Sequence, residues 1–227
     1  MKLYICPSFL KTRSVKKLNV VLLILAILLV DQVFKYYIKT NYYLGEDHPV
    51  LGNWFRLHFV ENEGMAWGWK LGESGSWGKM ALTLFRLLAV FFGVYYIGKI
   101  IREKYSRGFI ICVALIFAGA VGNLIDSLFY GMIFDGSDPY TRNVATLFPE
   151  GGGYANFLHG KVVDMLYFPI IRTTLPDWLP IWGGEPFEFF SPVFNIADSS
   201  ISIGLILILL FQNRFFPKEK EIKKPVE

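Results

Sequence analysis

Polar side chains occur inside segments of this chain that are otherwise apolar enough to cross a lipid bilayer. These residues are Asp31, Arg86, Asn123, Asp126, Asn195 and Asp198. An ionised side chain in that environment costs several kcal/mol, so each needs a physical reason. Taken singly, each can be structural: Asp31 can pair with Lys35 one helical turn later, and an arginine can extend its charge to the interface. Polar residues that arrive at one depth from separate segments favour a site instead.

The aspartates are the members of this set best suited to catalysis. Two carboxyl groups held close together in a low-dielectric setting cannot both ionise readily, so they share a proton. One carboxylate can then take a proton from water while the other group donates a proton to the substrate. Asp198 is the first candidate for such a pair. Asp126, Asp164 and Asp31 are the alternatives for its partner.

Other catalytic and metal-binding patterns are absent from the sequence. It has no H-E-x-x-H motif, and its 3 histidines fall between the apolar segments, so a zinc hydrolase would lack its usual ligands. The serines near Asp198 have no G-x-S-x-G context, and no histidine is expected at their depth to activate them. The 2 cysteines, Cys6 and Cys112, lie in unrelated segments. We therefore expect no metal ion and no cofactor.

The elements that must position these residues are membrane spans. Hydrophobic residues make up 53% of the 227-residue chain and charged residues only 19%, a composition too apolar for an ordinary soluble domain. A span needs about 20 mostly apolar residues. Four windows qualify, at about residues 18–38, 80–97, 109–129 and 193–212. We predict a mainly α-helical, polytopic membrane protein with four transmembrane helices in one domain, residues 1–227.

Lysine and arginine residues give the direction of the spans. Basic clusters precede the first span, join the second to the third at residues 98–108, and follow the fourth. By the positive-inside rule, both termini and this loop face the cytoplasm, and the longer segments 39–79 and 130–192 lie outside. At about 1.5 Å per helical residue, the polar residues of the spans then share one layer below the outer surface. Topology also explains the net charge of +4 without nucleic-acid binding.

The two outer segments are expected to form a small β-sheet and loops at the membrane surface. The stretch NWFRLHFV, residues 53–60, alternates with Phe55, Leu57 and Phe59 on one face, which is strand periodicity. Residues 165–192 contain several prolines that would break a helix, together with aromatic residues suited to the lipid headgroup zone. We interpret this second part as an interfacial loop.

Five short motifs follow one another along the chain. They are DQVFK (31–35), NEGMAWG (62–68), GAVGNLIDS (119–127), HGKVVDM (159–165) and FNIADSSISIG (194–204). Together they resemble the motifs of the lipoprotein signal peptidase family, also called signal peptidase II. Their order on a chain with four predicted spans makes the match more specific than any one motif.

The resemblance implies an aspartic endopeptidase of the bacterial inner membrane, with its active site on the periplasmic side. Such an enzyme removes signal peptides from prolipoproteins, cutting immediately before a lipobox cysteine that carries a diacylglyceryl group. By motif position, Asp164 and Asp198 resemble the catalytic pair. The residues that resemble supporting or substrate-binding positions are Asp31, Lys35, Asn62, Gly64, Asn123, Asp126 and Asn195. The resemblance also implies contact with membrane phospholipid, inhibition by globomycin-type compounds, and a monomer.

Two features depart from the family pattern. Ser127 stands where an arginine is usual, which removes a local charge partner for Asp126, and we expect Arg86 to compensate. Two connections are also longer than usual, at about residues 132–158 and 172–188. Both lie outside the predicted spans, where insertions are tolerated, so they affect substrate access and partners and not the fold.

A small proton-coupled membrane transporter is the alternative function, since carboxylates inside membranes also form proton relays. Polar residues confined to the outer layer, and the lack of detectable inverted repeats, count against it. A noncatalytic assembly protein that docks partners through its outer loops is a third possibility.

Overall fold

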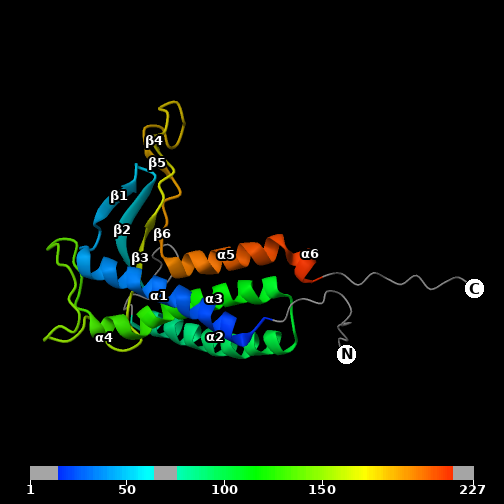
Figure 1. The fold of residues 1–227 in the computed structure, drawn as a ribbon. Coiled ribbons are helices and arrows are strands. Elements are labelled where there is room, and N and C mark those ends of the chain that lie inside the picture. Colours follow the sequence, from blue (N-terminus) through cyan, green and yellow to red (C-terminus); the bar gives the residue numbers. More distant parts are fainter. Residues whose placement is uncertain (1–14, 64–75, 217–227) are drawn as a thin grey trace, which may run out of the picture.

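Four apolar helices run side by side and form the larger part of the fold (Figure 1). The computed structural model describes residues 15–63 and 76–216. The helical elements are α1 (Lys17–Asn41), α2 (Ser76–Arg102), α3 (Arg107–Ile125) with its extensions η2 (Asp126–Tyr130, a π-helical turn) and α4 (Gly131–Ile133), α5 (Ile196–Leu210) and α6 (Gln212–Phe215). Three helical stretches are long and apolar enough to cross a membrane, and α5 is a shorter apolar helix. The predicted mainly α-helical membrane fold with a small sheet is confirmed.

Helix α3 packs against each of the other three long helices. Its contact with α5 is close because glycines replace larger residues where the two helices meet. A Cβ atom on Gly119 would lie 2.2 Å from the carbonyl oxygen of Ala197, and one on Gly204 would lie 2.7 Å from that of Cys112. Small residues allow backbones to approach in this way in membrane helices, whose association depends on packing.

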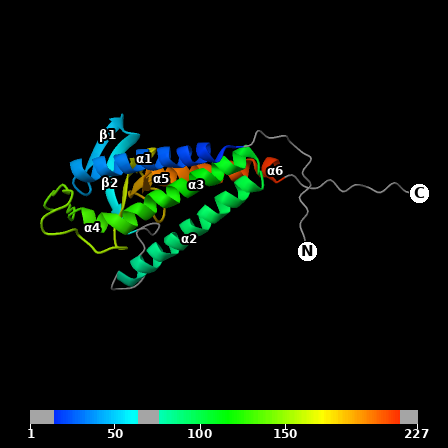
Figure 2. The same cartoon turned by 60° about the horizontal axis from the view of Figure 1, so that its bottom comes forward.

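Helix α2 approaches α3 at its C-terminal end and diverges from it toward its N-terminal end (Figure 2). At the close end, Ile100 is buried in an apolar cluster with Phe109 of α3. In its N-terminal half, α2 is attached to the connection before the third strand, because Thr83 Oγ1 donates a hydrogen bond to the carbonyl oxygen of Leu158 at 3.0 Å. Helix α2 therefore contacts different partners at its two ends.

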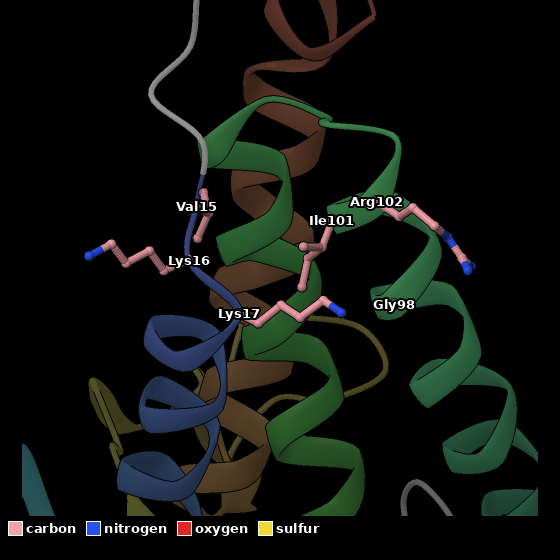
Figure 3. Close-up of a pocket in the computed structure, with 6 residues that line it drawn as sticks. All are labelled: Val15, Lys16, Lys17, Gly98, Ile101 and Arg102. Atoms are coloured by element: carbon pink, nitrogen blue, oxygen red, sulfur yellow. The ribbon is translucent and has the colours of Figure 1, made fainter.

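The end of the bundle at which α1 begins carries clustered positive charge, and we call it the basic end. A cavity of about 450 Å³ opens there between α1 and α2 (Figure 3). It is lined by Val15, Lys16, Lys17, Gly98, Ile101 and Arg102. Lys17 points toward the space between the helices, whereas Lys16 and Arg102 point outward. The positive-inside rule assigns the orientation of a membrane protein from lysine and arginine residues clustered at one end of its helices.

A four-stranded antiparallel sheet lies at the opposite end, which we call the sheet end (Figure 1). Its strands are β1 (Asp47–Leu51), β2 (Phe55–Asn62), β3 (Val162–Tyr167) and β6 (Val193–Phe194), in the order β1-β2-β3-β6. Strand β2 contains most of the stretch NWFRLHFV, so the predicted strand is confirmed. Phe59, Val163 and Met165 are fully buried from this sheet and pack with Ile38 of α1. The sheet is thereby attached to the end of α1.

Helix α5 begins later than the apolar window 193–212. Val193 and Phe194 form strand β6, and Asn195 caps the helix, since its side-chain oxygen accepts a hydrogen bond from the backbone N–H of Asp198 at 2.8 Å. Hydropathy alone does not separate the strand from the helix because both are apolar. The cap residue marks the true boundary.

Residues 165–192 contain regular strands, so the interpretation of this part as a loop is wrong in its secondary structure. After β3, strand β4 (Ile171–Thr174) pairs with β5 (Pro186–Phe189) in a separate two-stranded sheet. The prolines do exclude a helix, but they lie between strands, in the turn, or at the first position of β5. A missing N–H group is tolerated at those places.

The long connection between α4 and β3 packs against the sheet end of α1. Lys39 of α1 is fully buried, forms an ion pair with Glu61 of β2 and donates a hydrogen bond to Ser137 Oγ at 3.0 Å. Its ammonium group also lies 5.0 Å from the ring centroid of Tyr154. One lysine thus joins the helix, the sheet and the inserted connection.

Replacing Gly119 by alanine should lower the stability of the fold. The added methyl group would collide with the carbonyl oxygen of Ala197, and overpacking of this kind costs about 1–3 kcal/mol. Gly98→Ala is the control, because a Cβ there would meet no atom within 4 Å in the described part of the chain outside its own helix. Thermal unfolding of both variants in detergent measures the difference. Equal midpoints for the two variants would contradict the prediction.

Candidate active site

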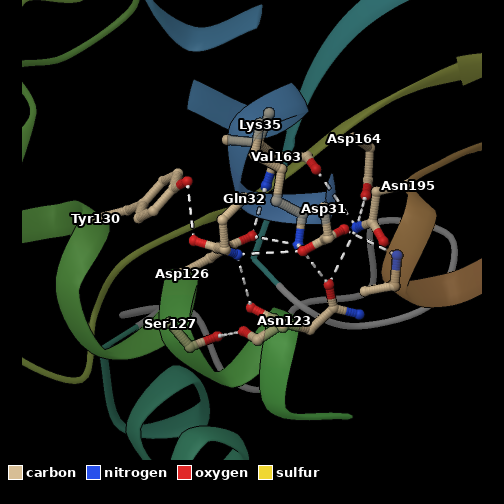
Figure 4. A network of polar contacts seen from close by, with 12 residues as sticks. Asp31, Gln32, Lys35, Asn123, Asp126, Ser127, Tyr130, Val163, Asp164 and Asn195 are labelled. Atoms are coloured by element: carbon tan, nitrogen blue, oxygen red, sulfur yellow. Dashed lines mark hydrogen bonds and ion pairs between the residues drawn. The ribbon is translucent and has the colours of Figure 1, made fainter. Parts of the chain in front are cut away.

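Lys35 lies at the centre of a buried charge cluster at the sheet end (Figure 4). Its ammonium group forms ion pairs with Asp31 of α1 at 2.9 Å and with Asp126 of η2 at 2.8 Å. It also donates a hydrogen bond to Oδ1 of Asn123 at 2.9 Å. The three charged side chains are at most 1% exposed. Removing charges from water is costly, and this pairing compensates for the cost.

Gln32 and Tyr130 belong to the same cluster, although sequence analysis did not select them. The side-chain nitrogen of Gln32 donates hydrogen bonds to Asp126 at 2.9 Å and to Asp31 at 3.1 Å. The hydroxyl of Tyr130 donates to the side-chain oxygen of Gln32 at 3.2 Å. Gln32 carries the signal that selected the other residues, a polar side chain inside a span. Tyr130 carries no comparable signal because tyrosine is common near membrane surfaces.

Asp31 also helps to determine where α5 begins. Its Oδ1 accepts a hydrogen bond from the backbone N–H of Ala197 at 2.8 Å, while Asn195 accepts from the N–H of Asp198. Two N–H groups of the first turn, which have no partner within a helix, are satisfied in this way. The positive end of the helix dipole favours the carboxylates of Asp31 and Asp198 nearby. Helix α1 therefore positions the first turn that carries Asp198.

Asp164 and Asp198 are connected through two asparagine side chains. The amide nitrogen of Asn195 donates hydrogen bonds to Asp164 Oδ1 at 2.7 Å and to Asn123 Oδ1 at 3.1 Å. The amide nitrogen of Asn123 then donates to Asp198 Oδ1 at 2.7 Å. From β2, Asn62 donates to the second oxygen of Asp164 at 3.3 Å. These amides are neutral, so they orient the carboxyl groups without supplying a counter-charge.

The backbone beside Asp164 is held on both edges of β3. One edge pairs with β2, where Asp164 lies opposite Val60. On the other edge, the N–H of Val163 donates to Asp126 Oδ2 at 3.4 Å, and its carbonyl oxygen accepts from Asn195 at 3.3 Å. The direction of the Asp164 side chain is therefore set by the sheet and by the charge cluster together.

Burial raises the pKa of the Asp164 carboxyl to about 7, and the nearby charge of Asp198 acts in the same direction. Hydrogen bonds from Asn62 and Asn195 oppose this rise in pKa. The side chain is 2% exposed, so desolvation of the charged form is the larger effect. A carboxyl group of this kind beside a second one suits a pair that holds a single proton.

Arg86 brings a second cation to the cluster from α2. Its Nη1 donates a hydrogen bond to Ser127 Oγ at 3.2 Å. Asp198, Asp126 and Asp164 are the carboxylates that act electrostatically on its guanidinium group. Ser127 and Arg86 are therefore in direct contact, and the positive charge comes from another helix.

The cluster gathers residues from five helical elements, α1, α2, α3, η2 and α5, and from the two strands β2 and β3. Of the residues selected from the sequence, it contains Asp31, Lys35, Asn62, Arg86, Asn123, Asp126, Asp164, Asn195 and Asp198. Gly64, which was also selected, lies outside the described residues. Over residues 15–63 and 76–216, no three His, Cys, Asp or Glu side chains are placed to hold a metal ion.

A family model described as signal peptidase (SPase) II matches residues 23–214, a range that includes every residue of the cluster. The chain belongs to the signal peptidase II family. A lipoprotein signal peptidase of Porphyromonas gingivalis is 52% identical over 189 residues, which cover 83% of this chain and 80% of that protein. One from Amoebophilus asiaticus is 35% identical over 201 residues, or 87% of this chain and 76% of that protein. The signal peptidase II resemblance of the five motifs is confirmed.

Solved structures agree with this family assignment of the fold. A bacterial membrane enzyme aligns with a TM-score of 0.58 and 26% identity, covering 93% of this chain and 99% of that one. A second bacterial membrane enzyme aligns with a TM-score of 0.56 and 25% identity, covering 88% and 96%. This signal peptidase II chain therefore shares the fold of these bacterial membrane enzymes over most of its length.

Replacing Lys35 by methionine should destabilise the signal peptidase II fold by about 3–5 kcal/mol, because it leaves two buried carboxylates without their cation. Lys17→Met, at an exposed position of the same helix, is the control and should change stability by no more than about 0.5 kcal/mol. Thermal unfolding in detergent compares the two. A Lys35→Met protein that unfolds with the wild type would show that the ion pairs do not hold the cluster.

The raised pKa of Asp164 predicts how its replacement alters the dependence of stability on pH. The folded-state pKa of about 7 lies above the unfolded value of about 3.9, so the folded protein binds this proton more tightly. Its stabilising contribution is present below the lower pKa and is lost as the pH rises through the higher one. An asparagine side chain does not titrate, so the stability of Asp164→Asn lacks this pH-dependent contribution.

Between about pH 5 and pH 8, the stability of Asp164→Asn relative to wild type should therefore rise by about 2–3 kcal/mol. Unfolding midpoints at several pH values measure the change. Asp177→Asn, which removes an exposed carboxyl group in the connection between β4 and β5, controls for loss of an aspartate. Parallel stability curves for wild type and Asp164→Asn would refute the assignment of the buried proton.

Proposed function

We propose that this protein is a membrane aspartic endopeptidase that removes signal peptides from prolipoproteins. It cuts immediately before a lipobox cysteine that carries a diacylglyceryl group. Membership of the signal peptidase II family supports the peptidase activity and the class of substrate. The observation that carries the aspartic mechanism is the buried Asp164, which is connected to Asp198 through the side chains of Asn195 and Asn123. Burial and the charge of Asp198 both raise the pKa of Asp164.

Asp164 fits as the partner of Asp198 better than the other aspartates do. Asp31 and Asp126 both form ion pairs with Lys35, and each also accepts a hydrogen bond from a backbone N–H group. They hold the fold together. Asp164 instead accepts hydrogen bonds from neutral amides and lies within the electrostatic influence of Asp198. A shared proton is the state that this environment favours.

Peptide hydrolysis then proceeds by general acid–base catalysis. The carboxylate of the pair removes a proton from a water molecule, whose oxygen forms a bond to the scissile carbonyl carbon. The protonated partner stabilises the resulting gem-diol and donates its proton to the leaving nitrogen as the C–N bond breaks. The products are a carboxylic acid on the signal peptide and a free amine on the lipidated cysteine. The pair titrates as one unit, so the starting base is a property of both aspartates.

The remaining residues of the cluster act as supports in this proposal. Asn123 and Asn195 orient the two carboxyl groups through the hydrogen bonds at 2.7 Å. Arg86 supplies positive charge near the pair and compensates for Ser127 at the position where an arginine is usual. Asn62 orients Oδ2 of Asp164. The assignment of Gly64 as a supporting or substrate-binding residue rests on the NEGMAWG motif alone.

We further propose that the basic end faces the cytoplasm and the sheet end the periplasm. The clustered cations at the basic end support this orientation in the bacterial inner membrane. It places both termini inside and the aspartate pair at the periplasmic side of the bilayer. The acyl chains of the substrate stay in phospholipid, where each buried methylene contributes about 0.8 kcal/mol. We expect a single membrane domain that acts as a monomer and is inhibited by globomycin-type compounds.

The transporter alternative is not favoured. The family is one of peptidases, and the polar network described above joins α1, η2 and β3 at the sheet end. A transporter would need a polar path toward the basic end, and the buried residues there form an apolar cluster around Ile100 and Phe109.

Loss of either catalytic aspartate should abolish the activity. Asp164→Asn and Asp198→Asn should each reduce cleavage of a diacylglyceryl-modified prolipoprotein by at least about a thousandfold, because each group is needed for proton transfer. Purified protein reconstituted in lipid, with product size and N-terminus measured by mass spectrometry, tests this. Asp177→Asn should retain wild-type cleavage. Undiminished cleavage by a folded Asp198→Asn variant would eliminate the aspartic mechanism.

A further inference from the structure

The β4–β5 hairpin has one apolar and one polar face. In its register, Ile171 lies opposite Phe189 and Thr173 opposite Phe187. Alternate residues of a strand point to opposite faces, so these four side chains share one face. The other face carries Arg172 opposite Glu188 and Thr174 opposite Pro186.

The apolar side of this hairpin is uncovered within the described structure. Ile171 is 50% exposed and Phe189 53% exposed. The apolar side chains of the turn beyond the strands are exposed to a still larger fraction, with Trp178 at 78%, Ile181 at 72% and Trp182 at 58%. A two-stranded hairpin is at best marginally stable in water without a surface to cover its apolar face.

The position of the hairpin indicates which surface covers its apolar face. Figure 1 shows it projecting across the direction of the helices, at the level where α5 begins. Between this level and the basic end, the helices carry exposed apolar residues such as Phe91 (79% exposed) and Leu210 (72% exposed), as expected for helices surrounded by lipid. A segment that leaves the bundle sideways at this level runs along the bilayer surface. Tryptophan is enriched at that level in membrane proteins.

The base of the hairpin is attached to the sheet that carries Asp164. Arg172 Nη2 donates a hydrogen bond to the hydroxyl of Tyr167 at 2.6 Å, and this hydroxyl also contacts the carboxylate of Glu188. Tyr167 is the last residue of β3, the strand of Asp164. On the return side, the ring of Phe190 lies 6.2 Å from that of Phe194 in β6, directly before α5.

We propose that the β4–β5 hairpin is a membrane contact whose apolar face and tryptophans rest on the outer phospholipid layer. Its polar face, with the Arg172–Glu188 ion pair, faces water. Because the hairpin lies in the chain between Asp164 and Asp198, this contact sets the height of the sheet above the bilayer. The lipid-covered surface of the helices thus continues sideways onto the hairpin.

A depth measurement tests the contact without any need for enzymatic activity, so it is independent of the proposed function. An environment-sensitive fluorophore is attached at Ile181→Cys in a protein that also carries Cys6→Ser and Cys112→Ala, reconstituted in nanodiscs. Tyr140→Cys, at a 95% exposed residue of the other long connection, is the matched control. We expect brominated phospholipid to quench the Ile181 probe at least about threefold more than the Tyr140 probe.

Two results would overturn the proposal. If aqueous iodide quenches both probes equally, the hairpin stands in water. If the Ile181 probe is shielded from iodide but is not quenched by brominated lipid, protein covers the apolar face, whether from this chain or from a second copy. In the double variant Trp178→Ser with Trp182→Ser, lipid quenching at position 181 should fall by about half. Unchanged quenching there would also count against the contact.

The link to the active site is tested by activity in bilayers and rests on the proposed function. For a lipidated prolipoprotein, kcat/KM of the double tryptophan variant should fall about fivefold, because the sheet is no longer held at the lipid surface. Tyr140→Ser should retain full kcat/KM. Full kcat/KM in the double variant would show that the membrane contact does not affect the active site, and it would not contradict the depth measurement. A wild type without cleavage would reject the proposed function instead.

Discussion

One buried lysine that serves two carboxylates is the interaction on which the rest of the site depends. Ions in a lipid environment must find partners within the protein, and Lys35 satisfies Asp31 and Asp126 together. Each carboxylate also accepts a hydrogen bond from a backbone N–H group, Asp31 from that of Ala197 and Asp126 from that of Val163. The two carboxylates paired with Lys35 thereby fix the backbone directly before Asp198 and directly before Asp164.

Neighbouring aspartates of this cluster have different physical roles because their partners differ. A cation beside a carboxylate makes it a structural element, as with Asp126. Burial and the nearby charge of Asp198 instead raise the pKa of Asp164 to about 7, and the hydrogen bonds from neutral amides oppose this rise only in part. Asn123 and Asn195 separate the two environments, because Asn123 accepts from Lys35 on one side and donates to Asp198 on the other. The structural ion pairs and the proposed acid–base pair are thus adjacent but chemically distinct.

Sequence patterns predicted the parts of this fold that depend on local composition. The helices could be predicted because each is long and apolar, and β2 because its alternation spans a whole strand. The β4–β5 hairpin was missed because prolines obscure the strand pattern around Ile171 and Phe187. The partner of Asp198 could not be chosen from spacing, since it depends on which carboxylates Lys35 reaches. Contacts of Gln32 and Tyr130 likewise join segments distant in sequence.

The hairpin leaves the sheet and returns to it at neighbouring positions. Strands β3 and β6 pair directly, with Leu166 opposite Phe194 and Tyr167 opposite Val193, so the ladder closes beneath the excursion. Residues can therefore be gained or lost above that closure during evolution while the two carboxyl groups keep their separation. The length of the hairpin is thereby uncoupled from the separation of the two carboxyl groups, whereas its contact with the sheet through Tyr167 is not.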